Sequence, residues 1–323
     1  MRVFIKGLSI TGLALCLAAP SLALEVDPKI QPYSKVSGVS GSIKSVGSDT
    51  LNNLMTLWSE GYRAAYPAVR IEIEGKGSST APPALIQGTS HFGPMSRAMK
   101  GKEADEFEKK FGYKPSVVRV AVDALAVFAN KDNPVECLTM QQLDAIFSKN
   151  RKGGAEKDIQ TWGDLGLKGE WAAKPISLYG RNSASGTYGY FKELALFKGD
   201  YKDSVKEQPG SSAVVQGVAS DKYGIGYSGV GYKTADVRIV PLAGEDGACY
   251  DANAENAYSG DYPLARFLYV YLNKNPNVDL DPLRAEFVKY VYSTEGQIAV
   301  IKDGYFPVSK ALADEDLAGV GLK

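Results

Sequence analysis

Short apolar runs alternate with amphipathic stretches along most of this 323-residue chain. The alternating residues 69–73 and the apolar residues 175–179 are typical of strands, whereas apolar positions across residues 51–62 recur at helical spacing. Two longer β-prone runs occupy residues 117–130 and 267–272. Because strands and helices alternate throughout, the pattern predicts an α/β fold with largely parallel sheets.

Loops of small polar residues follow several predicted strands just where a helix is expected to begin. They lie at residues 47–50, 75–80, 91–97 and 180–187. Helix N-termini leave backbone N–H groups unpaired and carry the positive end of the helix dipole. In parallel sheets these termini gather at the carboxyl ends of the strands. The repeated loops therefore predict a binding site for an oxyanion.

The loop at residues 180–187 offers the richest set of donors. Arg181 supplies a planar cationic fork, Ser185 and Thr187 supply hydroxyls, and Gly186 lets a ligand approach the backbone. The alternative is a plain helix N-cap beside a surface arginine, because Ser-Gly-Thr before a helix is common capping chemistry. The three companion loops favour the binding interpretation.

The first 23 residues have the pattern of a secretory signal peptide. Arg2 and Lys6 precede an apolar run at residues 8–19, and small residues lead up to Ala23. The run is too short to span a membrane, so cleavage after Ala23 and export to the periplasm are expected, with Cys16 leaving in the removed segment.

Charge and composition exclude several classes of function. The chain has 37 basic and 37 acidic residues, and loss of Arg2 and Lys6 leaves 35 against 37, a net charge of −2. Such a balance disfavours binding to nucleic acid or insertion at a membrane surface. About 300 mature residues suggest two domains.

The scarcity of histidine argues against metal and hydrolase chemistry. His91 is the one histidine of the chain and is expected to be structural, so neither a metal site nor another cofactor is predicted. A secreted serine hydrolase or phosphatase would need a base beside its nucleophile. Apart from His91, the chain has no histidine that could act as the base for a serine nucleophile such as Ser79 or Ser185.

Three further residues leave alternatives open. Cys137 and Cys249 form either a disulfide or two buried thiols. Asp123 lies inside an apolar run, where a buried carboxylate needs a cationic partner such as Arg97. Otherwise Asp123 lies at a bend and faces water.

Residues 148–174 are polar and rich in glycine, and are expected to form a surface loop.

The loops together resemble those of the periplasmic phosphate-binding proteins of bacterial ABC phosphate uptake systems. The resemblance rests on Gly-Ser-Asp-Thr at 47–50, Gly-Ser-Ser at 77–79, Phe-Gly to Arg at 92–97 and the loop ending in Thr187. It extends over nearly the whole mature chain, and the element Arg-x-x-x-Ser-Gly-Thr at 181–187 is its most specific part.

The resemblance implies a type II periplasmic-binding-protein fold, in which two lobes enclose a ligand and are joined by two hinge crossings. The crossings are expected near residues 126–130 and 267–272. The first lobe would comprise residues 24–127 plus 268–323, and the second residues 128–267. The implied function is to bind inorganic phosphate as a monomer, without catalysis, and to deliver it to the permease subunits of an ABC importer.

The resemblance also implies which residues hold the anion. The expected ligand-binding residues are Ser48, Asp49, Thr50, Leu51, Ser78, Ser79, Ser96, Arg97, Asp123, Arg181, Ser185, Gly186 and Thr187. Of the two adjacent serines, Ser79 is favoured over Ser78.

One loop departs from the best-known members of the family. They carry an aspartate where this chain has Ser96-Arg97, and that aspartate accepts the proton of phosphate and so rejects sulfate. Asp123 is the first choice for this role here and Asp49 the second. Alternatives are a receptor for sulfate, phosphonate or molybdate, the secreted hydrolase, and a surface adhesion or signalling protein that binds phosphate secondarily.

Overall fold

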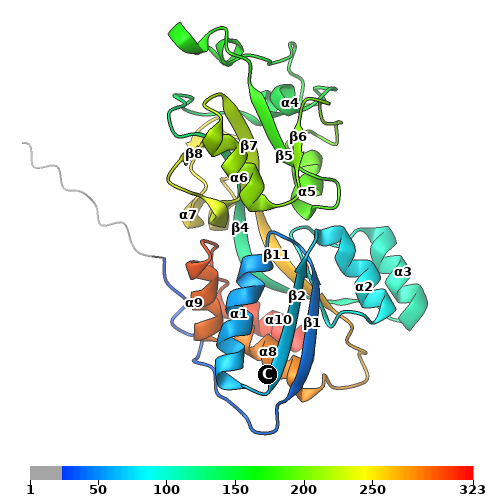
Figure 1. Cartoon of the computed structure of the whole chain (residues 1–323). Coiled ribbons are helices and arrows are strands. Elements are labelled where there is room, and N and C mark those ends of the chain that lie inside the picture. Colours follow the sequence, from blue (N-terminus) through cyan, green and yellow to red (C-terminus); the bar gives the residue numbers. More distant parts are fainter. Residues whose placement is uncertain (1–23, 323) are drawn as a thin grey trace, which may run out of the picture.

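The computed structural model describes residues 24–322, so the expected signal peptide lies outside the described residues. Within them the chain forms two α/β lobes, one above the other in Figure 1, which share the long strand β4 (Ser116–Asn130). None of the helices in residues 24–322 has the length and apolar character needed to cross a lipid bilayer.

The first lobe is built on a five-stranded sheet in the order β2-β1-β3-β11-β4. Strand β1 pairs in parallel with β2 and β3, whereas β11 runs antiparallel to both β3 and β4. The other strands are β1 (Gly41–Gly47), β2 (Val69–Gly75), β3 (Phe92–Met95) and β11 (Ala265–Leu272). The helices are α1 (Asn52–Ala65), α2 (Ala81–Gln87), α3 (Gly101–Phe111), α8 (Pro282–Val291), α9 (Thr294–Lys302) and α10 (Lys310–Gly319), with the short 3-10 helix η1 (Ser78–Thr80) before α2.

The second lobe continues from the far half of β4 through β7 and β5 to β6, and β8 also pairs with β4. Strands β5 and β7 are parallel to each other, as are β5 and β6. The strands are β5 (Ser177–Arg181), β6 (Lys206–Gln208), β7 (Gly224–Gly229) and β8 (Val237–Ile239), with a separate hairpin of β9 (Leu242–Ala243) and β10 (Cys249–Tyr250). The helices are α4 (Met140–Phe147), α5 (Gly186–Leu194), α6 (Ser211–Ser220) and α7 (Ala254–Ser259), and three short 3-10 helices are η2 (Trp162–Leu165), η3 (Gly169–Trp171) and η4 (Val230–Tyr232).

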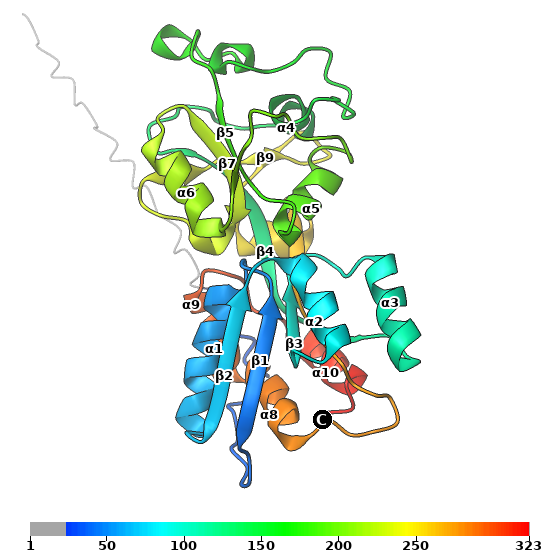
Figure 2. The same cartoon turned by 45° about the vertical axis from the view of Figure 1, so that its right-hand side comes forward.

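Strand β4 changes partners halfway along its length. Up to Ala124 it pairs with β11, and from Leu125 onward it pairs with β7. The two lobes are therefore halves of one continuously hydrogen-bonded strand order. Figure 2 shows β4 running from one lobe into the other. The crossings expected at residues 126–130 and 267–272 fall within β4 and β11.

Each lobe has its own apolar core. Trp58, Tyr62 and Phe287 are buried in the first, and Phe191 and Tyr227 stack in the second with ring centroids 3.9 Å apart. The expectation that residues 148–174 form only a surface loop is wrong for their two tryptophans. Trp162 and Trp171 pack edge to face inside the second core, because short 3-10 turns in this polar stretch direct both rings inward.

The structure joins Cys137 to Cys249 in a disulfide, one of the two alternatives that the sequence left open. The bond ties the segment after β4 to strand β10, and 112 positions separate the two cysteines in the sequence. Cross-links that close long loops remove much of the entropy of the unfolded chain.

Replacing both cysteines by serine is expected to lower the free energy of unfolding by about 2–4 kcal/mol, because the unfolded chain regains the freedom of that loop. Urea unfolding of the oxidised parent and the double variant measures the difference. The parent under reducing conditions should match the variant. Equal midpoints for the oxidised parent and the variant would show that the bond contributes no stability.

Candidate functional site

Four buried hydroxyl side chains meet where the two lobes face each other, and we call them the hydroxyl cluster. Thr50, Ser78 and Ser96 come from loops of the first lobe, and Thr187 comes from the first turn of α5 in the second. The Oγ1 atoms of Thr50 and Thr187 are 3.0 Å apart. Ser96 Oγ lies 3.3 Å from Ser78 Oγ and 3.5 Å from Thr187 Oγ1. The structure thus brings three separate polar loops and α5 to one point.

Glycine at position 186 makes this close approach possible. A Cβ atom there would lie 2.2 Å from Ser78 Oγ and 2.6 Å from Ser96 Oγ, so both hydroxyls would have to move away from their present positions. Gly77 has a left-handed φ of 117°, and a Cβ there would lie 2.5 Å from the carbonyl oxygen of Ala184. The backbones of the two lobes therefore touch without intervening side chains.

A buried ion pair supports the cluster from the first lobe. Arg266, at the start of β11, donates from Nε and Nη2 to Asp123 Oδ2 at 2.9 and 2.7 Å. It also donates to the carbonyl oxygen of Ser96 at 2.8 Å and to Thr187 Oγ1 at 3.0 Å. The other carboxylate oxygen of Asp123 accepts from the Val230 N–H at 3.0 Å. Both oxygens of Asp123 are therefore engaged.

A second arginine and carboxylate meet across the lobes. Arg181, at the end of β5, is buried and lies 3.2 Å from Asp49 Oδ2. It donates to Ser211 Oγ at 2.7 Å, and the Ser211 N–H donates to the same Asp49 oxygen at 2.8 Å. Burial lowers the pKa of the Arg181 guanidinium, and Asp49 opposes that effect. The Nε atom of Arg181 is buried and makes no hydrogen bond to any described residue.

The start of α1 adds backbone donors. Neither Asp49 nor Thr50 caps this helix, because the N-cap is Leu51 and it has no side-chain hydrogen bond. Within residues 24–322 the N–H groups of Thr50 and Leu51 donate to no other residue. The hydroxyl of Tyr305 holds the loop by donating to the Thr50 carbonyl oxygen at 2.9 Å. Burial raises the pKa of Tyr305 well above its ordinary value, so this donor keeps its proton.

The remaining candidates lie near the cluster but have other partners in the structure. Ser79 donates through its hydroxyl and its N–H to the Ala184 carbonyl oxygen, so Ser78 and not Ser79 reaches the hydroxyl cluster. Ser185 Oγ caps α5 by accepting from the N–H groups of Thr187 and Tyr188. Ser48 is buried, and its N–H donates to the Pro94 carbonyl oxygen.

Arg97 pairs with a different carboxylate from the one expected. Its guanidinium donates to both carboxylate oxygens of Glu103 on α3, at 2.7 and 2.8 Å. The expectation that Arg97 neutralises Asp123 is therefore wrong, and Arg266 takes that place. Arg266 was not among the expected site residues. In the sequence it ends the segment Tyr-Pro-Leu-Ala-Arg, and nothing in its spacing links it to Asp123, 143 positions earlier.

Ser211 was also missed as a residue of the site. The structure places its hydroxyl and its N–H between Arg181 and Asp49. Its signal was a fifth small polar stretch, Gly-Ser-Ser at 210–212, before a helix. His91, expected to be structural, accepts at Nδ1 from the Lys44 N–H, outside the cluster.

A further carboxyl group lies next to the start of α1. Asp303 accepts from the Asn53 side-chain amide, and its Oδ2 is buried without a hydrogen bond to any residue among 24–322. Burial raises the pKa of Asp303 to about 6; the Asn53 hydrogen bond opposes this rise, and the nearby Asp123 carboxylate adds to it.

Two lobes on a shared strand, with polar loops of both lobes meeting in a buried cluster, define the class of two-lobed solute-binding proteins. A family model described as a PBP superfamily domain matches residues 34–295. The chain is 57% identical over 315 residues to the phosphate-binding protein PstS of Pseudomonas aeruginosa, covering 97% of this chain and 98% of that one. The chain therefore belongs to the PBP superfamily and, within it, to the family of this relative.

More distant proteins agree with this assignment. A phosphate-binding protein PstS of Staphylococcus epidermidis is 29% identical over 265 residues, which are 81% of this chain and 77% of the relative. A crystal structure of a phosphate ABC transporter substrate-binding protein with bound phosphate, from Clostridium perfringens, matches with a TM-score of 0.70 and 27% identity. The match covers 83% of this chain and all of that one. These relatives are named as binding proteins and not as enzymes.

The raised pKa of Asp303 predicts a pH dependence of stability. The folded protein holds this proton up to about pH 6, whereas an unfolded aspartate releases it near pH 4. The protonated Asp303 carboxyl therefore contributes fully to the free energy of unfolding below about pH 4, and this contribution is lost as the pH rises to about 6. Asp303→Asn, which keeps the bond from Asn53, should be more stable than the parent at pH 8 by about 2–3 kcal/mol.

Urea unfolding of the parent and of Asp303→Asn at pH 4 and pH 8 measures this effect. At pH 4 both side chains are neutral, so the two proteins should have similar stabilities there. An equal difference between them at both pH values would show that ionisation of Asp303 does not affect folding.

Proposed function

We propose that this chain binds inorganic phosphate between its two lobes and delivers it to the permease of an ABC importer. The observation that carries the proposal is the hydroxyl cluster, flanked by two buried arginines and by the free N–H groups before α1. The names of the Pseudomonas relative and of the phosphate-bound Clostridium structure support it. We further propose that the protein acts in the periplasm as a monomer after cleavage behind Ala23.

The proposed anion binds mainly through neutral donors. The two arginines already face Asp49 and Asp123, so these four side chains have no net charge. The charge of the anion would be met by the hydroxyls of Thr50, Ser78, Ser96 and Thr187 and by the dipoles at the starts of α1 and α5. Each hydrogen bond to a charged group contributes about 1.5–3 kcal/mol.

Binding requires the cluster to rearrange. In the structure the hydroxyls of the two lobes form hydrogen bonds to one another. These bonds must break as the lobes separate, and the hydroxyls can then bond to the anion when the lobes close around it. We propose that residues 24–127 with 268–323 move as one body and residues 128–267 as the other. The change of partners along β4 between Ala124 and Leu125 supports a hinge close to those limits.

Selectivity for phosphate needs a carboxylate that accepts its proton, and Asp49 fits this role better than Asp123. Both oxygens of Asp123 already accept hydrogen bonds, from Arg266 and Val230. Asp49 uses only Oδ2, and among the described residues its Oδ1 accepts no hydrogen bond. Fully ionised sulfate has no proton to donate, so its oxygen would face this carboxylate unpaired, an arrangement that disfavours binding strongly.

Calorimetry on phosphate-stripped residues 24–323 tests the proposed function. Phosphate should bind with micromolar or tighter affinity, while sulfate gives no heat. Thr187→Val removes one hydroxyl at nearly constant shape and should weaken phosphate binding roughly tenfold or more. Thr56→Val is the matched control, because its hydroxyl bonds to the Asn52 carbonyl oxygen within α1 and not to the cluster. If neither anion binds the parent protein, the proposal fails.

Replacing the two carboxylates one at a time separates their roles. Asp49→Asn should weaken phosphate binding and admit sulfate, because its amide can donate to a fully ionised oxygen. Asp123→Asn should instead destabilise the fold by about 3–5 kcal/mol, because Arg266 then stays buried without its counter-charge. Calorimetry and urea unfolding of both variants give the two readouts. An Asp49→Asn protein that still excludes sulfate would return the acceptor role to another group.

A further inference from the structure

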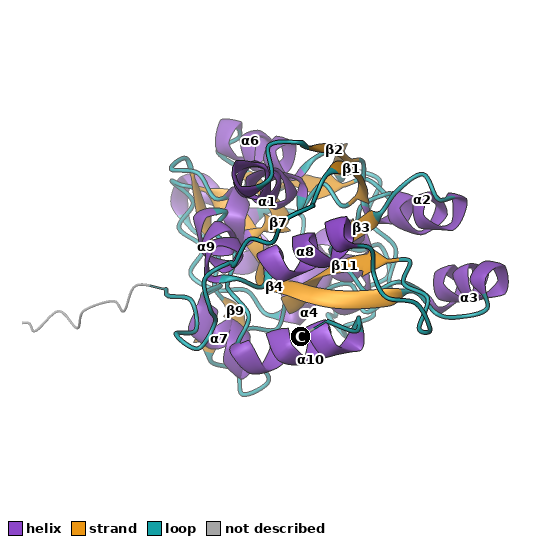
Figure 3. Ribbon diagram, turned by 90° about the horizontal axis from the view of Figure 1, so that it is seen from below, coloured by secondary structure: helices purple, strands orange, loops and turns teal. Residues whose placement is uncertain are grey.

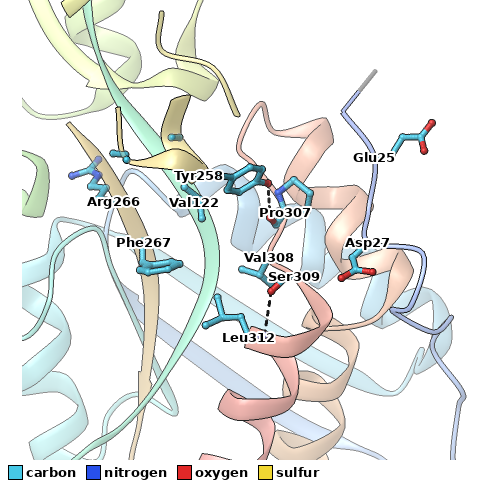
Figure 4. Close-up of a pocket in the computed structure, with 13 residues that line it drawn as sticks. Glu25, Asp27, Val122, Tyr258, Arg266, Phe267, Pro307, Val308, Ser309 and Leu312 are labelled. Atoms are coloured by element: carbon cyan, nitrogen blue, oxygen red, sulfur yellow. Dashed lines mark hydrogen bonds between the residues drawn. The ribbon is translucent and has the colours of Figure 1, made fainter. Parts of the chain in front are cut away.

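A second space between the lobes lies beside the crossing strands and is not part of the hydroxyl cluster. It has a volume of about 670 Å³ and is lined mainly by apolar side chains (Figure 4). Ala257 and Tyr258 of α7 form its wall from the second lobe. Pro307, Val308 and Leu312 of the α10 region form its wall from the first. We call this space the rear pocket.

The rear pocket and the hydroxyl cluster lie on opposite faces of β4. Successive side chains of a strand point to opposite faces. Val122 and Phe267 line the pocket, whereas their neighbours Asp123 and Arg266 bond to each other beside the cluster, and Arg266 also contributes to the lining of the pocket. Seen along the long axis, α7 and α10 lie on one side of β4 and α1 and α6 on the other (Figure 3). The shared strand therefore lies between the proposed anion site and the pocket, and Arg266 borders both.

This placement couples the two spaces mechanically. When two lobes rotate about a strand that joins them, widening the gap on one face narrows the gap on the other. Separation of Thr50 from Thr187 must then bring α7 towards the α10 region. Protein interiors resist compression, so volume that fills the narrowing gap opposes the rotation.

Few polar contacts connect the two walls of the pocket. Among the described residues that line the pocket, one hydrogen bond joins the two walls, from the Tyr258 hydroxyl to the Pro307 carbonyl oxygen at 2.6 Å. Tyr258 is otherwise 52% exposed. Leu312 is only half-buried and points into the space from α10 (Figure 4). The gap can therefore narrow by moving α7 over an apolar surface, and it can also be filled from either wall.

We propose that the rear pocket sets the equilibrium between open and closed lobes, and that added volume in it favours the closed state. The proposal rests on the proposed function only where phosphate is used as the readout. A ligand held by the closed state leaves when the lobes open, so stabilising the closed state slows its release.

Leu312→Trp fills the pocket from the first lobe, and Ala257→Leu fills it from the second. Ile298→Trp adds a large side chain at a position on α9 that is 52% exposed and outside the pocket, and it serves as the matched control. Phosphate release should slow about fivefold or more in each filling variant and stay unchanged in the control. A fluorescent phosphate reporter in stopped flow measures the rates.

The distance between two dyes, one on each lobe, gives a readout that needs no phosphate. In anion-free protein both filling variants should shift the distance distribution towards the closed state. If the parent protein binds no phosphate, the proposed function fails while this measurement still tests the pocket. Filling variants that retain the parent's unfolding midpoint, release phosphate at the parent's rate and leave the distances unchanged would overturn the proposal. If Leu312→Trp does not fold, Ala257→Leu gives the same decision from the opposite wall.

Discussion

The buried pair of Arg266 and Asp123 is the interaction on which the site depends. It lies where β11 meets β4, so the same two residues pair two strands and place a cation beside the hydroxyl cluster. A buried charge is tolerated only when it is paired and fully hydrogen-bonded, and here each carboxylate oxygen and all three guanidinium nitrogens have partners. The pair therefore neutralises its own charges and also holds Ser96 and Thr187 in position.

This arrangement explains how a protein with almost no net charge can hold an anion. Its net charge attracts no anion over long distances, because the full chain has 37 basic and 37 acidic residues. Selection must then occur by contact, through donors whose geometry is set before the anion arrives. Helix starts without side-chain caps, such as that of α1, supply such donors at no cost in charge.

The α/β class and the polar loops could be predicted from the sequence because their signals are local. Hydrophobic spacing marked β2, α1 and β11, and small residues before helices marked Thr50, Ser78 and Thr187. The partner of Asp123 could not be predicted, because strand register across 143 positions decides it. The role of Ser211 could not be predicted for the same reason, because it depends on β5 ending beside the start of α6. The buried Trp162 and Trp171 show that a polar segment can still supply core side chains.

The interrupted path of the chain has a consequence for the order in which the lobes can form. The sheet of the first lobe needs β11, which follows the whole second lobe in the sequence. During synthesis the second lobe can acquire its core while the first lobe still lacks β11, an interior strand of its sheet. Pairings between residues so far apart form slowly. A chain of this topology therefore stays incompletely folded until nearly all of it has been made.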